Sequence, residues 1–172
     1  MEKNQKIEIE IKGQIEEAVD WFGENITKKP TTLATKNLFN VQKDSEELNE
    51  EKSDLFQSIL AKLLYICKRA RPDVETVVAY LCTRVSKSTM EDWSKLRRVL
   101  AFLKKTIDDI RIIGADSMQE FYTWIDATYG VHEDLKSHTG RGISMGTGLG
   151  HSKSSKEIKC KNFYRSRVGR DK

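Results

Sequence analysis

The sequence lacks any apolar run that approaches the roughly 18 residues typical of a membrane span. Its first ten residues, MEKNQKIEIE, are charged and lack the apolar segment of a secretory signal. Cysteines are few and odd in number (Cys67, Cys82 and Cys160), and no CxxC spacing for a metal occurs. These absences predict an intracellular protein with reduced thiols, cytoplasmic or nuclear, and without a membrane partner.

Motifs for nucleotide or metal chemistry are also missing. The glycine-rich stretch 140–150, GRGISMGTGLG, is not followed by Gly-Lys-Ser/Thr, so hairpin turns are favoured over a phosphate-binding loop. The three histidines, His132, His138 and His151, share no metal-ligand spacing. We therefore expect no small-molecule substrate, and no cofactor for the chain by itself.

The net charge of +4 is unevenly distributed along the chain. Residues 1–60 carry 8 Lys/Arg against 13 Asp/Glu, whereas residues 61–172 carry 22 against 13. The basic C-terminal part favours a polyanion as partner, because like charges on one part of a protein raise the local concentration of counter-charged molecules.

Residues 46–105 have the helical periodicity on which the fold prediction depends. An apolar stripe predicts a first helix over 46–66, and valines, leucine and cysteine between 74 and 85 recur at helical spacing and predict a second. Trp93, Leu96, Leu100 and Leu103 predict a third. Its start is a capping box made by either Ser88 with Glu91 or Thr89 with Asp92. The sequence thus predicts three helices on one core.

The link between the first two helices contains the triplet Arg71-Pro72-Asp73. Proline suits the first position of a helix, and it disfavours a helical conformation at the residue before it. Asp73 suits the N-terminal end of the outgoing helix. We therefore assign structural roles to Arg71, Pro72 and Asp73, with Arg71 anchoring Asp73 or a neighbouring carbonyl.

The flanking segments alternate between apolar and polar residues. The segment KIEIEIK (6–12) predicts a strand with one buried face, and a short helix over 15–22 follows, which Gly23 closes. Residues 26–45 are interpreted as a surface connection. Strands are predicted near 110–113 and 120–127, with Tyr122 and Trp124 in the core of the sheet rather than on a base-stacking platform. The predicted fold class is α+β, dominated by helices.

Five elements in order resemble the C-terminal part of the reverse transcriptase of copia-type LTR retrotransposons. They are KLLYI from residue 62, RPD from 71, EDW from 91 with LAFLK from 100, WIDA from 124 and DLKSHTG from 134. The resemblance implies a palm-tail strand and helix over 1–35 and a three-helix, thumb-like domain over 36–106. It further implies a small, incomplete antiparallel RNase H-like sheet over 107–162.

This resemblance implies a fragment of an RNA-directed DNA polymerase that is catalytically inactive alone. The family's polymerase aspartates lie in a Tyr-Val-Asp-Asp turn, and this sequence has only Asp108-Asp109 after a helix. Asp126 matches the first RNase H carboxylate, which binds Mg²⁺ in the parent family. Two-ion phosphoryl transfer needs several converging carboxylates, so we interpret Asp126 as a remnant.

The resemblance also implies contact with an RNA–DNA hybrid or duplex through the third helix. The basic residues concerned are Lys95, Arg97, Arg98, Lys104 and Lys105. Their alternative interpretation is a solvated helix face. Two other functions stay open. Residues 46–105 could form a protein-interaction module, or Asp126 could share a metal with Glu133 and Asp134 in an RNase H-like nuclease.

Residues 163–172 have no pattern of a packed element, and we expect them to be unstructured. The family continues here with Ser-Thr-Glu-Ala-Glu-Leu. The segment FYRSRVGR can be back-translated so that the next reading frame encodes that peptide. We hypothesise that the reading frame slipped at this point. A genomic sequence unable to encode the peptide in the next frame would refute the hypothesis.

Overall fold

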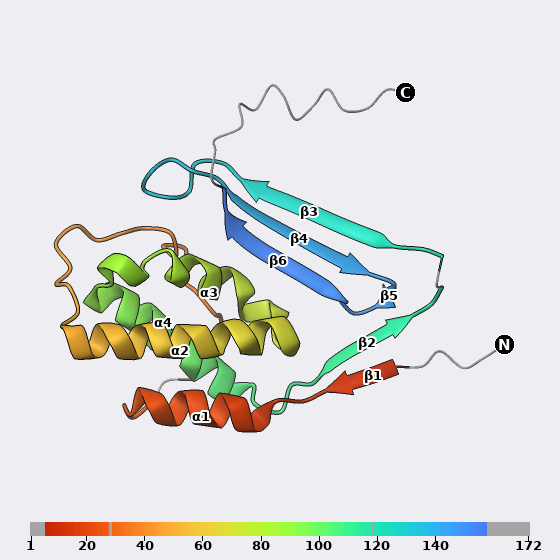
Figure 1. The fold of residues 1–172 in the computed structure, drawn as a ribbon, viewed down its shortest axis with the longest axis horizontal. Helices are drawn as coiled ribbons and strands as arrows, with labels where there is room; N and C mark the ends of the chain where they lie inside the picture. Colours follow the sequence, from red (N-terminus) through yellow and green to blue (C-terminus); the bar gives the residue numbers. More distant parts are fainter. Residues whose placement is uncertain (1–5, 28, 118, 158–172) are drawn as a thin grey trace.

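Four α-helices pack around one apolar core in the computed structural model, which describes residues 6–27, 29–117 and 119–157 (Figure 1). They are α1 (Lys12–Phe22), α2 (Glu50–Arg69), α3 (Glu75–Cys82) and α4 (Met90–Lys105), with short 3-10 turns at Pro72–Val74 and Val85–Lys87. The three helices predicted from residues 46–105 are present. Helix α1 adds Ile15, Ala18 and Phe22 to the same core. Within the described ranges, no helix combines the length and apolar character needed to cross a membrane.

The ends of the helices follow local capping chemistry. Thr89 and Asp92 form the capping box of α4: the amide of Thr89 donates to Asp92 Oδ2 at 3.1 Å, and Thr89 Oγ1 accepts from the Asp92 amide at 3.5 Å. The side chain of Asn49 accepts from the Lys52 amide at 3.0 Å, so α2 begins at Glu50 rather than at residue 46. Helix α1 ends at Gly23, whose φ of 68° suits glycine.

The described strands form two antiparallel three-stranded sheets, where the sequence suggested one. One sheet has the order β1 (Lys6–Ile9), β2 (Arg111–Ala115) and β5 (Gly146–Thr147). The other has the order β3 (Tyr122–Thr128), β4 (His138–Ser144) and β6 (His151–Lys156). Residues 158–162 of the predicted sheet, and the predicted tail 163–172, lie outside the described residues.

The predicted buried face of the N-terminal strand is wrong. Ile7 is 63% exposed, and all four residues of β1 are exposed or only partly buried. The reason is that β1 is the edge strand of a small sheet that extends beyond the helices (Figure 1). Alternation of apolar residues indicated a strand correctly, but it does not indicate what covers the strand.

The second sheet is attached to the helices through β6. Glu75 on α3 is only 4% exposed, and its carboxylate accepts hydrogen bonds from Ser152 Oγ and, at 3.0 Å, from the Ser154 amide. The Lys68 ammonium of α2 pairs with the same carboxylate. Strand β6 therefore lies next to α3, and β3 lies at the far edge of the sheet (Figure 1).

The expected burial of Tyr122 and Trp124 is also wrong. The two side chains are 45% and 55% exposed, and every residue of β3 is exposed. Because α3 contacts the sheet at β6, the far edge strand has no helix over it among the described residues. An exposed strand edge with large apolar side chains is the liability for self-association expected of an incomplete sheet.

Arg71 joins the ends of three elements in the helical core. The guanidinium is 3% exposed and donates to both carboxylate oxygens of Asp73, at 3.0 and 2.8 Å. It also donates to the carbonyl oxygen and hydroxyl of Thr106, at 2.9 and 2.7 Å, just after α4. Pro72 occupies the start of the following 3-10 turn. This geometry is that of a structural anchor.

Replacement of Arg71 by methionine is expected to lower the free energy of unfolding by about 2–3 kcal/mol, because buried acceptors on Thr106 lose their donors. The matched control is Arg69→Met, since Arg69 is exposed and lies over the Tyr65 ring. The control is expected to lose less than about 1 kcal/mol. Urea unfolding followed by circular dichroism measures both, and equal losses would contradict the anchoring role.

Candidate functional site

The five basic residues predicted to contact nucleic acid lie on α4 but in two environments. Arg97, Lys104 and Lys105 are exposed, whereas Lys95 and Arg98 are partly buried. The buried pair lies under residues 24–42, the connection between α1 and α2. Only part of the predicted surface is therefore open to a large partner.

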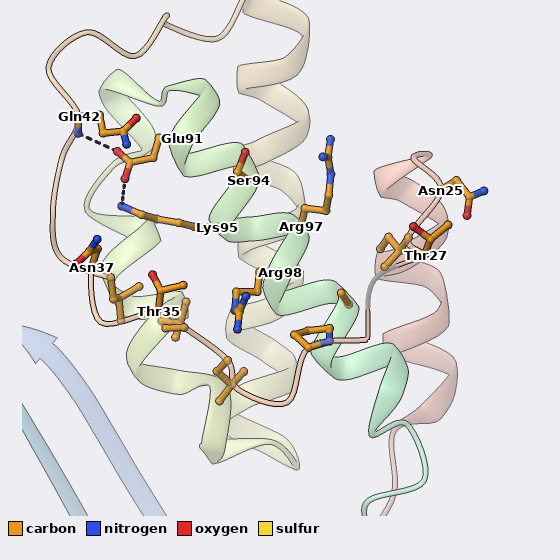
Figure 2. Close-up of a pocket in the computed structure, with 17 residues that line it drawn as sticks. Asn25, Thr27, Thr35, Asn37, Gln42, Glu91, Ser94, Lys95, Arg97 and Arg98 are labelled. Atoms are coloured by element: carbon orange, nitrogen blue, oxygen red, sulfur yellow. Dashed lines mark hydrogen bonds and ion pairs between the residues drawn. The ribbon is translucent and has the colours of Figure 1, made fainter.

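A pocket of about 470 Å³ lies between this connection and α4 (Figure 2). Glu91, Ser94, Lys95 and Arg98 face it because residues three, four and seven apart share one face of a helix. Figure 2 shows Lys95 reaching Glu91, with a 3.1 Å ion pair, while Glu91 also accepts from the Gln42 amide at 2.9 Å. The pocket is thus closed on one side by charge-assisted contacts.

The basic side chains of α4 hold the connection in place. Lys95 Nζ donates to the Asn40 carbonyl at 2.7 Å, and Arg98 donates to the carbonyl and hydroxyl of Thr32 at 3.0 and 2.9 Å. Arg97 pairs with Glu24, which also accepts from the Trp93 indole. A phosphate would have to compete with these groups for Lys95, Arg97 and Arg98.

Asp126 lies in a second, more open groove of about 460 Å³ on the sheet face that turns toward α3. The groove is lined by Trp124 and Asp126 of β3 and, on β4, by two residues without side chains, Gly140 and Gly142. Leu149 fills the space over Gly142, where an added Cβ would meet Leu149 Cδ2 at 2.8 Å. The groove therefore has an aromatic ring, a carboxylate and backbone on its surface.

The acidic residues of the proposed nuclease do not come together around Asp126. Glu133 and Asp134 line a different pocket, and no group of three His, Cys, Asp or Glu side chains in the described ranges could hold a metal ion. Asp134 instead pairs with Lys136 at 3.0 Å and Lys156 at 2.9 Å. Slight desolvation raises the pKa of Asp134, but these two partners outweigh it and lower the value to about 2.

The structure brings together two histidines that sequence reasoning left apart. His132 Nε2 lies 3.0 Å from His138 Nδ1, and His138 Nε2 lies 2.7 Å from Ser154 Oγ. Both imidazoles are buried and pack against the ring of Phe39, and His132 also stacks on Tyr80. Their separation along the chain spans a loop, so no periodic signal in the sequence could have paired them.

The order serine, histidine, histidine resembles a nucleophile with its base and orienting group. Ser154, however, is poorly placed for acyl transfer. Its amide donates to the Glu75 carboxylate, so a negative charge lies where an oxyanion needs donors, and its hydroxyl also contacts Thr76 Oγ1 at 3.2 Å. We interpret the network as a polar contact that joins the sheet to the helices.

No family model matches the sequence, and no solved structure matches the fold.

The buried histidine pair predicts a loss of stability in weak acid. Burial lowers the pKa of His132 to about 4 and also lowers that of His138. The unfolded chain therefore binds more protons, and stability present above about pH 6.5 is lost as pH falls toward 4. The charged groups that modulate the pair are Lys156, Lys136, Asp134 and Glu157.

Urea unfolding at pH 7 and pH 5 tests this dependence. The wild-type chain is expected to lose about 1–2 kcal/mol more over this interval than the double variant His132→Asn/His138→Asn. His151, which is exposed, supplies the control through His151→Asn, whose pH dependence should equal the wild type. An unchanged pH dependence in the double variant would show that other groups cause the acid sensitivity.

Proposed function

We propose that this chain is a segment of a copia-type reverse transcriptase, comprising thumb helices and the first strands of its RNase H domain. The observation that carries the proposal is the order of elements. The helical core is followed by β2, which belongs to the sheet with β1 and β5, and then by the antiparallel sheet of β3, β4 and β6, with Asp126 on β3. This order agrees with the layout that the sequence resemblance implies.

The residues that carry the resemblance occupy positions that determine the fold. Arg71 and Pro72 form the joint between α2 and α3, and Asp92 completes the cap of α4. Trp93 is fully buried and stacks on Phe22, with ring centroids 4.7 Å apart. Because these motif residues have structural roles, they support a similarity of fold to the family and do not indicate a catalytic activity.

The proposed activity is binding to duplex or hybrid nucleic acid without catalysis by the segment itself. Lys104 and Lys105 are exposed in the last turn of α4, and Arg97, which is exposed and paired with Glu24, lies about two turns before them on the same side of the helix. Together they offer three cations to a phosphate backbone. The Mg²⁺ ions of the parent family do not fit the groove around Asp126, because a hard cation needs several oxygen ligands and Asp126 is the one carboxylate among the described residues that line it.

A helical protein-interaction module is the second candidate. It is favoured by Leu64 and Tyr65, which are neighbouring exposed residues on α2. Exposed aromatic and leucine side chains on a helix are suited to a groove of another protein.

The nucleic-acid proposal predicts retardation of an RNA–DNA hybrid at about 50 mM salt, with affinity that falls steeply as salt is raised. The triple variant Arg97→Gln/Lys104→Gln/Lys105→Gln is expected to reduce the slope of log affinity against log salt by up to about 3. The matched control is Lys43→Gln/Lys87→Gln, which removes exposed charges outside α4. Absence of any wild-type complex at the lowest salt would reject the proposal and favour the interaction module.

Catalysis is tested separately with the same hybrid and Mg²⁺. We expect no hydrolysis above background, with Asp126→Asn indistinguishable from the wild-type chain, because a single carboxylate cannot position two ions. Mg²⁺-dependent cleavage that disappears in Asp126→Asn would overturn this assignment and establish the nuclease.

A further inference from the structure

The hydrogen-bond register of β3, β4 and β6 divides their side chains between two faces. Ser152 and Ser154 contact α3, so the alternate residues of β6 point to the opposite face, which we term the outer face. Register extends this division across the sheet. The nine outer-face positions are Thr123, Ile125, Ala127, Thr139, Arg141, Ile143, His151, Lys153 and Ser155.

The outer face carries positive charge and no carboxylate at these nine positions. Arg141 is directly opposite Lys153 in the register, and His151 lies two residues from Lys153 on the same strand. All three side chains are exposed. Thr139 and Ser155 lie next to Arg141 and Lys153 on their strands, and Thr123 is opposite Ile143, whereas the inner face of the same sheet carries Asp126 and Lys156 and meets Glu75.

The cations of the outer face differ from three of the five basic side chains of α4 in having no protein partner in the described part of the chain. Among the described residues, Arg141 and Lys153 have no side-chain ion pair or hydrogen bond, while Lys95, Arg97 and Arg98 are held by the connection 24–42. A phosphate at the outer face would replace water only. At Lys95, Arg97 or Arg98 it would also have to displace protein carbonyl or carboxylate groups.

We propose that the outer face of the β3-β4-β6 sheet binds the phosphate backbone of nucleic acid through Arg141 and Lys153. Backbone contacts in such complexes come from Arg and Lys together with Ser and Thr hydroxyls, which is the composition found here. This inference rests on the proposed function, because it assumes the same partner, a nucleic-acid duplex or hybrid. It places the main contact on the sheet instead of on α4.

An anionic membrane surface is the competing partner for a basic patch. The hydroxyls of Thr139 and Ser155 beside the cations favour the nucleic acid, because they can donate to phosphate and sugar oxygens. The only large, mostly exposed apolar side chain among the nine is Ile125, at 73% exposure. A membrane-bound face would normally combine its cations with a wider apolar surface.

The test measures fluorescence anisotropy of a labelled RNA–DNA hybrid from about 50 to 200 mM salt. Loss of two phosphate contacts in Arg141→Gln/Lys153→Gln is expected to lower the salt slope by about 2 and the affinity at low salt by about tenfold or more. The charge-conserving variant Arg141→Lys/Lys153→Arg should retain binding. Lys43→Gln/Lys87→Gln removes the same charge outside the sheet and should leave the slope unchanged.

The outcomes separate this inference from the proposed function. Binding that Arg141→Gln/Lys153→Gln leaves intact, but the α4 triple variant removes, rejects the outer face and keeps the proposed function. No wild-type binding at any salt rejects both. Binding to vesicles containing phosphatidylserine, without binding to the hybrid, rejects the nucleic acid as partner. Each variant is expected to fold because all substituted side chains are exposed, and circular dichroism checks this.

Discussion

The hydrogen bonds from β6 to the buried Glu75 carboxylate fix how the β3-β4-β6 sheet lies against the helices. An ionised group with this little exposure is costly unless it is paired and hydrogen-bonded. Glu75 meets that requirement with Lys68 from α2 and with two donors from β6. Because those donors come from Ser152 and Ser154, alternate residues of all three strands must face away from α3. The division of the sheet into an inner face toward α3 and a basic outer face depends on this contact.

Local features of the fold could be predicted from the sequence because local chemistry determines them. The spacing of apolar residues predicted α2, α3 and α4. Thr89 with Asp92, one of the two capping boxes that the sequence allowed, marks the start of α4. The glycine at position 23 gave the end of α1. Glu75 was different. It reads as a favourable acidic residue in the first turn of a helix, and nothing in the sequence connects it with serines 77 and 79 positions away.

For the strands, the sequence predicted the position along the chain but not the burial of the side chains. Alternating side chains indicated β1 and β3 correctly, but burial depends on which distant segment packs on each strand. Trp124 and Ile7 are exposed because both strands are edges that the helices do not cover. The histidine pair is a further case. His132 and His138 meet only because the loop between them turns back and places both rings on Phe39, which lies in the connection between α1 and α2.

The pairing of basic side chains in the folded chain explains why the candidate site could not be predicted from the sequence. A list of basic residues favoured α4, since five of them occur within one helix. In the folded chain the acidic N-terminal part folds over that helix: Glu24 pairs with Arg97, and carbonyl groups of the connection take up Lys95 and Arg98. The sheet comes from the basic part of the chain, and its outer face meets no such compensation among the described residues. Binding of a polyanion there costs only the hydration of the cations, whereas binding at Lys95 or Arg98 also breaks contacts that hold the connection. The excess charge that matters for a polyanion is therefore the uncompensated part, and Arg141 and Lys153 on the sheet belong to it.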